Sequence, residues 1–152
     1  MTRGLVNQVE VAVSILKDQI DSDIVKPDRI YDVREKKKYD AKNGPVVTVY
    51  SDSPIVTSPS THSGKKKESS IAVDVKTYQR RKMSFKEARD KFQNVNSELE
   101  DIFDNNRTGS ICAIDSFKDP TLDDQSDGSR KLFRSVWSVD TVIYFEKYAN
   151  IS

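Results

Sequence analysis

Apolar residues recur at steps of three and four in two parts of the chain. The first series is Leu5, Val9, Ala12, Leu16 and Ile20, with Val6 and Val13 alongside. The second series is Phe85, Ala88, Phe92, Val95, Leu99 and Ile102. Because an α-helix makes one turn in about 3.6 residues, each series forms one apolar face, and the sequence predicts two amphipathic helices. Ser84 and Glu87 have the spacing of a capping box, which marks the start of the second helix.

Alternation of polar and apolar residues predicts β-strands between and after these helices. The alternation is clearest at 69–79, where Ile71, Val73 and Val75 share one face. The predicted strands are 28–33, 46–50, 69–79, 110–117 and 130–148. The resulting order is α-β-β-β-α-β-β. It predicts an α+β fold with a mostly antiparallel or mixed sheet and both helices packed on one face.

Two segments between these elements are rich in turn-forming residues. Residues 52–68 contain two prolines, a glycine, several serines and three consecutive lysines, and predict a long arm between the second and third strands. Residues 119–128 predict an acidic loop. A chain of 152 residues has the length of one domain. We therefore expect a single domain over 1–152, with a protruding arm at 52–68.

The composition predicts a modest core and a soluble chain. Hydrophobic residues make up 36% of the sequence, and 25 Lys and Arg nearly balance 24 Asp and Glu. A small core favours stabilisation by partners. No apolar run approaches the roughly 18 residues of a membrane helix, and the start of the chain does not resemble a secretory signal. The single cysteine, Cys112, fits folding in a reducing cytoplasm.

Few residues suggest catalysis. The only histidine, His62, lies in the predicted arm, where no third group would hold it as a general base. One Cys and one His do not make a zinc site, and no glycine-rich phosphate loop is present. The sequence therefore predicts neither an enzyme nor a cofactor or metal. One exception is Asp74-Val75-Lys76, because an acid and a lysine two apart on a strand resemble the Mg²⁺-binding pair of PD-(D/E)xK nucleases.

Charge is unevenly distributed along the chain. The basic residues that flank the strand at 69–79 are Lys65, Lys66, Lys67, Arg80, Arg81 and Lys82. The acidic residues of the predicted loop are Asp119, Asp123, Asp124 and Asp127. Separate positive and negative surfaces allow copies of one chain to associate. We therefore predict that Arg80, Arg81, Lys82 and the four aspartates contact other subunits or partners.

The order and pattern of these elements resemble the tail-terminator, or tail-completion, proteins of long-tailed viruses of bacteria and archaea. The segments that carry the resemblance are 5–20, 46–50, 70–78, the helix start at 84–88, and 136–145. The resemblance implies a structural virion protein that forms a homo-oligomeric ring, commonly a hexamer. Such a ring caps the tail tube, ends its polymerisation and joins it to the head connector.

The same resemblance implies the partners and the location. The partners are other copies of the chain, the tail-tube protein, the head connector or adaptor protein, and genomic DNA passing through the lumen, with no membrane. The protein would be made in the host cytoplasm and reside in the neck region of the tail. Lys65, Lys66 and Lys67 would touch the DNA backbone if they faced the lumen.

Two other functions stay open on the sequence alone. A Mg²⁺-dependent nuclease would lose DNA cleavage on substitution of Asp74 or Lys76. A small binding module would be a stable monomer without either behaviour. The alternative without catalysis is that Asp74 and Lys76 form the solvated face of a half-buried strand.

Overall fold

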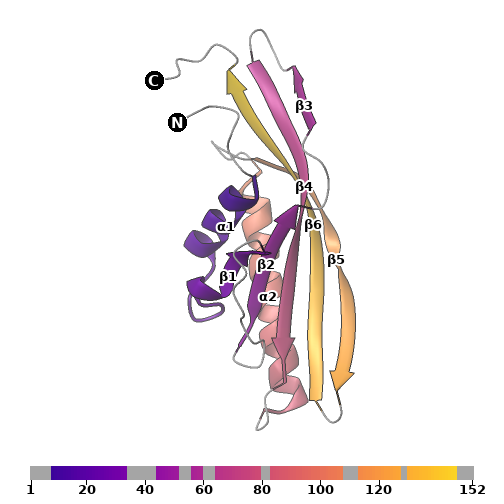
Figure 1. The fold of residues 1–152 in the computed structure, drawn as a ribbon. Helices are drawn as coiled ribbons and strands as arrows, with labels where there is room; N and C mark the ends of the chain where they lie inside the picture. Colours follow the sequence, from indigo (N-terminus) through magenta and orange to yellow (C-terminus); the bar gives the residue numbers. More distant parts are fainter. Residues whose placement is uncertain are drawn as a thin grey trace.

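A computed structural model describes residues 8–33, 44–51, 56–59, 64–79, 83–107, 113–127 and 130–146. The elements are α1 (Gln8–Gln19), the 3-10 helix η1 (Pro27–Arg29), β1 (Ile30–Asp32), β2 (Val46–Ser51), β3 (Val56–Pro59), β4 (Gly64–Tyr78), α2 (Phe85–Asn105), β5 (Ala113–Asp127) and β6 (Arg130–Glu146). The strands form one six-stranded mixed sheet, and both helices lie on one of its faces (Figure 1). The α+β fold predicted from the sequence is confirmed.

The sheet is organised around its two longest antiparallel neighbours, β4 and β6. The strand order is β1-β2-β4-β6-β5, and β3 pairs with β4 outside this path. β1 runs parallel to β2, and all other pairs are antiparallel. β2 pairs with residues 71–76 of β4, and β3 pairs with residues 65–68. Because β6 occupies the other side of β4 over its whole length, β2 and β3 follow one another along the same edge of β4.

The core lies between the helices and one face of the sheet. In the sheet, Val47, Val73 and Val139 are completely buried beneath the helices. Most of the predicted apolar positions that the structure describes are buried, but Ala12 is half-buried and Phe85, at the start of α2, is 43% exposed. Leu5 and Val6 lie outside the described residues. The buried helix residues are Val9, Val13, Leu16, Ala88, Phe92, Val95, Leu99, Ile102 and Phe103, with Ile20 just after α1.

Polar contacts fix the position and orientation of α2. The Ser84 half of the predicted capping box is confirmed, because Ser84 Oγ accepts a hydrogen bond from the Glu87 amide at 3.1 Å. In the middle of α2, Asn96 Oδ1 accepts from Ser135 Oγ at 2.6 Å and from Trp137 Nε1 at 2.9 Å. Both donors belong to β6. Asn96 therefore anchors the helix to the centre of the sheet as well as packing against it.

The sheet continues beyond the helices. β3, the first residues of β4 and the last residues of β6 form a three-stranded extension that projects past α1 and α2 (Figure 1). We define this extension as residues 56–59, 64–68 and 142–146. The sequence predicted an irregular arm at 52–68 and therefore missed β3 and the early start of β4. The pairing of a strand needs only backbone groups, so a polar, serine-rich segment can form one without the alternation that marks a half-buried strand.

The predicted acidic loop at 119–128 is wrong, because residues 119–127 belong to β5. The proline and the aspartates that suggested a turn are tolerated because β5 is the edge strand of the sheet. The register between β5 and β6 shifts between Lys118 and Thr121, and Pro120 lies within this irregularity. A smaller difference concerns residues 27–29, which form η1 before the short strand β1 rather than its first residues.

Candidate functional site

Asp74, the acid of the predicted nuclease pair, is held in an ion pair with Arg134. Alternation along β4 places Asp74 on the face opposite the helices, since Val73 and Val75 belong to the core. Arg134 Nη2 donates to Asp74 Oδ2 at 2.8 Å, and Arg134 Nε lies 3.1 Å from Oδ1 and 3.2 Å from Oδ2. The Asp74 side chain is 7% exposed. Its carboxylate is thus an acceptor for a two-pronged arginine, which is a structural arrangement.

Lys76 completes this cluster of charges on the open face of the sheet. In the strand register Lys76 lies directly opposite Arg134, and like charges in that position repel. The Asp74 carboxylate offsets the excess positive charge. Asp28, which with Pro27 would provide the upstream acid of a PD-(D/E)xK site, is exposed in η1. Within the described ranges, no three His, Cys, Asp or Glu residues are grouped so that they could hold a metal ion.

The residues predicted to contact partners fall in three different places. Lys65, Lys66 and Lys67 lie in the projecting extension, paired with β3 on one side and β6 on the other. Arg80, Arg81 and Lys82 lie outside the described residues. The four aspartates, Asp119, Asp123, Asp124 and Asp127, are spread along β5.

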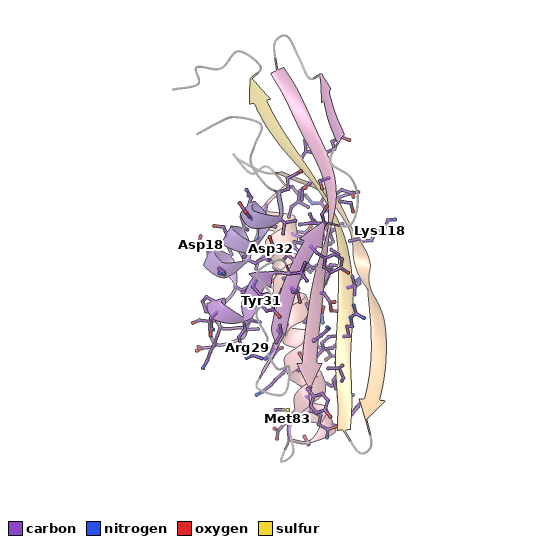
Figure 2. The ribbon with its side chains drawn as sticks, in the orientation of Figure 1. Asp18, Arg29, Tyr31, Asp32, Met83 and Lys118 are labelled. Atoms are coloured by element: carbon purple, nitrogen blue, oxygen red, sulfur yellow. The ribbon has the colours of Figure 1, made fainter. Side chains whose placement is uncertain are left out.

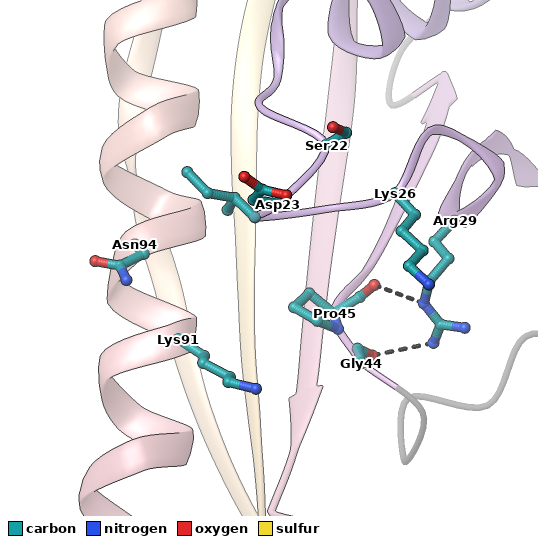
Figure 3. Close-up of a pocket in the computed structure, with 9 residues that line it drawn as sticks. Ser22, Asp23, Lys26, Arg29, Gly44, Pro45, Lys91 and Asn94 are labelled. Atoms are coloured by element: carbon teal, nitrogen blue, oxygen red, sulfur yellow. Dashed lines mark hydrogen bonds between the residues drawn. The ribbon is translucent and has the colours of Figure 1, made fainter.

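A basic cavity that the sequence analysis missed lies on the helix side, where η1, the start of β2 and α2 meet (Figure 3). Its volume is about 310 Å³. Lys26 and Arg29 come from the turn before β1 and from η1, and Lys91 extends from α2 toward Gly44 and Pro45 (Figure 3). Lys26 and Arg29 are three residues apart, but Lys91 comes from a distant part of the chain, so no local charge run signalled the cavity.

Hydrogen bonds to the backbone fix one of these cations. Arg29 Nε donates to the Pro45 carbonyl and Nη2 to the Gly44 carbonyl, both at 3.0 Å. Gly44 has a φ of 134°, a conformation that favours glycine. The turn before β2 therefore holds the guanidinium in place at the wall of the cavity. Among the described residues that line the cavity, Asp23 is the single acid, and their formal charges are three positive against one negative.

A second hollow, of about 540 Å³, lies between α2 and the β5–β6 pair. Its floor is aromatic, with Phe92 and Phe133 stacked at a centroid distance of 5.5 Å and Trp137 beside them. Arg89 and Glu100 lie at its polar rim. Because Trp137 and Phe92 are buried members of the core cluster, this hollow is a surface continuation of the core.

Comparison of the sequence with protein families and with curated proteins found no match. Neither helix that the structure describes has the length and apolar character needed to cross a membrane. Three features of the structure bear on function: the projecting sheet extension, the acidic edge strand β5 and the basic cavity.

Proposed function

We propose that this protein is a structural virion protein that assembles into a closed ring, commonly of six copies, caps the tail tube and joins it to the head connector. The observation that supports this most is the projecting extension of the sheet. Three strands extend past the helices that cover the rest of the fold (Figure 1). A subunit of a ring that joins tail and head needs an element that extends to contact its neighbours, whereas a compact binding module does not.

The extension gains stability from a neighbouring subunit. In β4 the core cluster draws on Ile71, Val73 and Val75, whereas the extension begins at residue 68 and runs back to Gly64. A small sheet is stable in water when three or more strands share a hydrophobic face or when it packs against a helix, and the extension projects past both helices (Figure 1). The free edge of β3 also leaves backbone groups open for pairing. Contact with the next copy in a ring satisfies both requirements.

The two edges of the sheet favour contact between unlike surfaces. One edge is the three-residue strand β1, and the other is the fifteen-residue strand β5. Pro120 and five aspartates make β5 a poor template for open-ended strand addition. Contacts between two different surfaces of one chain produce a ring when the rotation between copies closes.

In this ring the extension is the element placed to reach the lumen or the tube. Lys65, Lys66 and Lys67 would then meet DNA phosphates through a contact that does not depend on sequence and weakens with salt. Arg80, Arg81 and Lys82, with the aspartates of β5, remain predicted subunit or connector contacts. The ring would occupy the neck region of the virion tail.

Light scattering coupled to size exclusion tests the proposal on the full chain. We expect an oligomer of several copies, with the mass falling toward that of one 17.3 kDa chain as salt weakens the charged contacts. The experiment is repeated with purified tail tubes, because a terminator can close only on its tube. A monomer that also fails to bind tubes would reject the proposal.

A further inference from the structure

We infer that the basic cavity formed around Lys26, Arg29 and Lys91 is the socket for the acidic strand β5 of a second copy of this chain. The inference rests on the proposed function, since it names the contact that joins neighbouring subunits. The attraction between oppositely charged surfaces of neighbouring subunits is thereby assigned to two defined surfaces, the cavity and β5.

The socket has the chemistry needed to bind carboxylates. Lys26 and Lys91 are exposed, and each ammonium group offers up to three donors. Arg29 is held by two backbone carbonyls, so its charge is already in place before a ligand arrives. Pre-positioned groups lose little conformational freedom on binding, which favours affinity. A cavity of about 310 Å³ accommodates a few carboxylate side chains and is too small for a DNA duplex.

Strand β5 has the matching charge and lies at one edge of the sheet. It contains five aspartates and one lysine, a formal charge of −4. It is the edge strand, so one side of its backbone has no neighbouring strand in the sheet. The aspartates that follow Lys118 are Asp119, Asp123, Asp124 and Asp127. An edge with this charge and with Pro120 disfavours backbone pairing, and a contact through side chains is therefore the better fit.

The socket and β5 lie on opposite sides of one subunit. Arg29 precedes β1 at one edge of the sheet, and β5 forms the other edge. Figure 2 shows Arg29 and Lys118 on opposite sides of the molecule. A subunit therefore cannot fill its own socket with its own β5. The same pair of surfaces can repeat from copy to copy, as a ring requires.

Charge reversal on each side, followed by mixing, tests this contact. The socket variant is Lys26→Glu with Lys91→Glu, and the edge variant is Asp119→Lys with Asp124→Lys, which leaves Asp123 in place opposite Arg134. Each variant alone places like charges in every contact, so we expect the concentration for half-assembly to rise about tenfold or more. In a mixture the socket of one variant meets the edge of the other. We therefore expect mixing to restore oligomers in which the two variants alternate.

Two controls separate charge from folding. Lys86→Glu, on the same helix as Lys91 and also exposed, lies outside the socket and should leave assembly unchanged. Circular dichroism of each variant checks that the fold is retained. Recovery of assembly on mixing supports the inference even if one variant is less stable than the parent.

Three results overturn the inference, and they are distinguishable from failure of the proposed function. If the parent assembles and the socket variant assembles equally well, the socket is not the contact. If mixing restores nothing, the two surfaces are not partners. If the socket variant keeps its oligomer but loses binding of a short DNA duplex, the cavity is a phosphate site instead. A parent that is monomeric both alone and on tubes rejects the ring itself, and the inference with it.

Discussion

Arg134 on β6 binds the carboxylate of Asp74 on β4, on the face of the sheet opposite α1 and α2. Arg134 Nη2 lies 2.8 Å from Asp74 Oδ2, and Arg134 Nε lies 3.1 Å from Oδ1 and 3.2 Å from Oδ2. The pair links the two longest antiparallel neighbours of the sheet. It also accounts for the buried acid that suggested a metal-dependent nuclease. The arginine meets the charge of this carboxylate directly, so the pair stabilises the sheet without a metal ion.

Replacing Asp74 with Asn tests this structural role. The amide lacks the negative charge, so Arg134 loses its ion pair with this side chain, and we expect the free energy of unfolding to fall by about 1–3 kcal/mol. Urea denaturation followed by circular dichroism measures the change. Asp90→Asn is the matched control, because the Asp90–Arg89 pair is half-exposed at 3.9 Å and should matter by less than about 1 kcal/mol.

The same variants address DNA cleavage. The structural account predicts that the parent protein does not cut DNA in the presence of Mg²⁺, and that Asp74→Asn changes stability alone. Cleavage by the parent that disappears in Asp74→Asn and in Lys76→Ala, with the fold retained, would establish the nuclease instead.

Asn96 should be the most important polar residue on α2. Truncation to Ala removes the acceptor for both Ser135 and Trp137, and donors left without a partner near the core cost about 1–3 kcal/mol each. We expect Asn96→Ala to lower the free energy of unfolding by about 2–4 kcal/mol. Asn94→Ala, an exposed asparagine on the same helix, should change it by less than about 0.5 kcal/mol. Equal effects of the two substitutions would contradict the anchoring role.

Gly44 supports the basic cavity through its backbone. A residue with a side chain is disfavoured at a φ of 134°, so we expect Gly44→Ala to destabilise the fold by about 1–2 kcal/mol and to shift the carbonyl that binds Arg29. Denaturation measures the first effect, and the NMR signal of the Arg29 Nε–H reports the second. Gly128→Ala provides a comparison at another glycine. An Arg29 signal that is unchanged in Gly44→Ala would show that this turn does not position the guanidinium.

The projecting extension should be needed for assembly more than for folding. Lys66 lies in the middle of the paired segment, opposite Ser58 on β3 and Tyr144 on β6. Proline at this position removes a backbone donor and disrupts the local ladder, while the core beneath the helices is left intact. We expect Lys66→Pro to abolish the oligomer and to retain a folded monomer by circular dichroism. Lys66→Thr removes the charge but keeps the donor, so preserved assembly in that variant would assign the effect to the backbone.

The sequence was most informative where burial is one-sided. The apolar faces of both helices, the Ser84 cap and the alternation from Ile71 to Val75 were predictable, because each face of these elements meets a different environment. The pattern did not reveal β3 or the second half of β5. The alternation of polar and apolar residues that marks a half-buried strand is missing from both segments, so the backbone ladder maintains them without a hydrophobic signature.

The candidate site was less predictable than the fold. Lys26, Arg29 and Lys91 converge only after η1, β2 and α2 pack together, so no local spacing could indicate the cavity. The three consecutive lysines at 65–67, in contrast, are a local run of positive charge that the sequence alone makes visible. A run of charge along this sequence therefore does not show where positive charge gathers in the folded protein.

The central claim is that copies of this chain close into a ring. Negative-stain electron microscopy with rotational class averages tests it most directly, on the chain alone and on tail tubes. The account predicts round particles with a central channel and a single dominant symmetry, with six the expected number of copies. Isolated single subunits under both conditions, or open filaments of unlimited length, would contradict it.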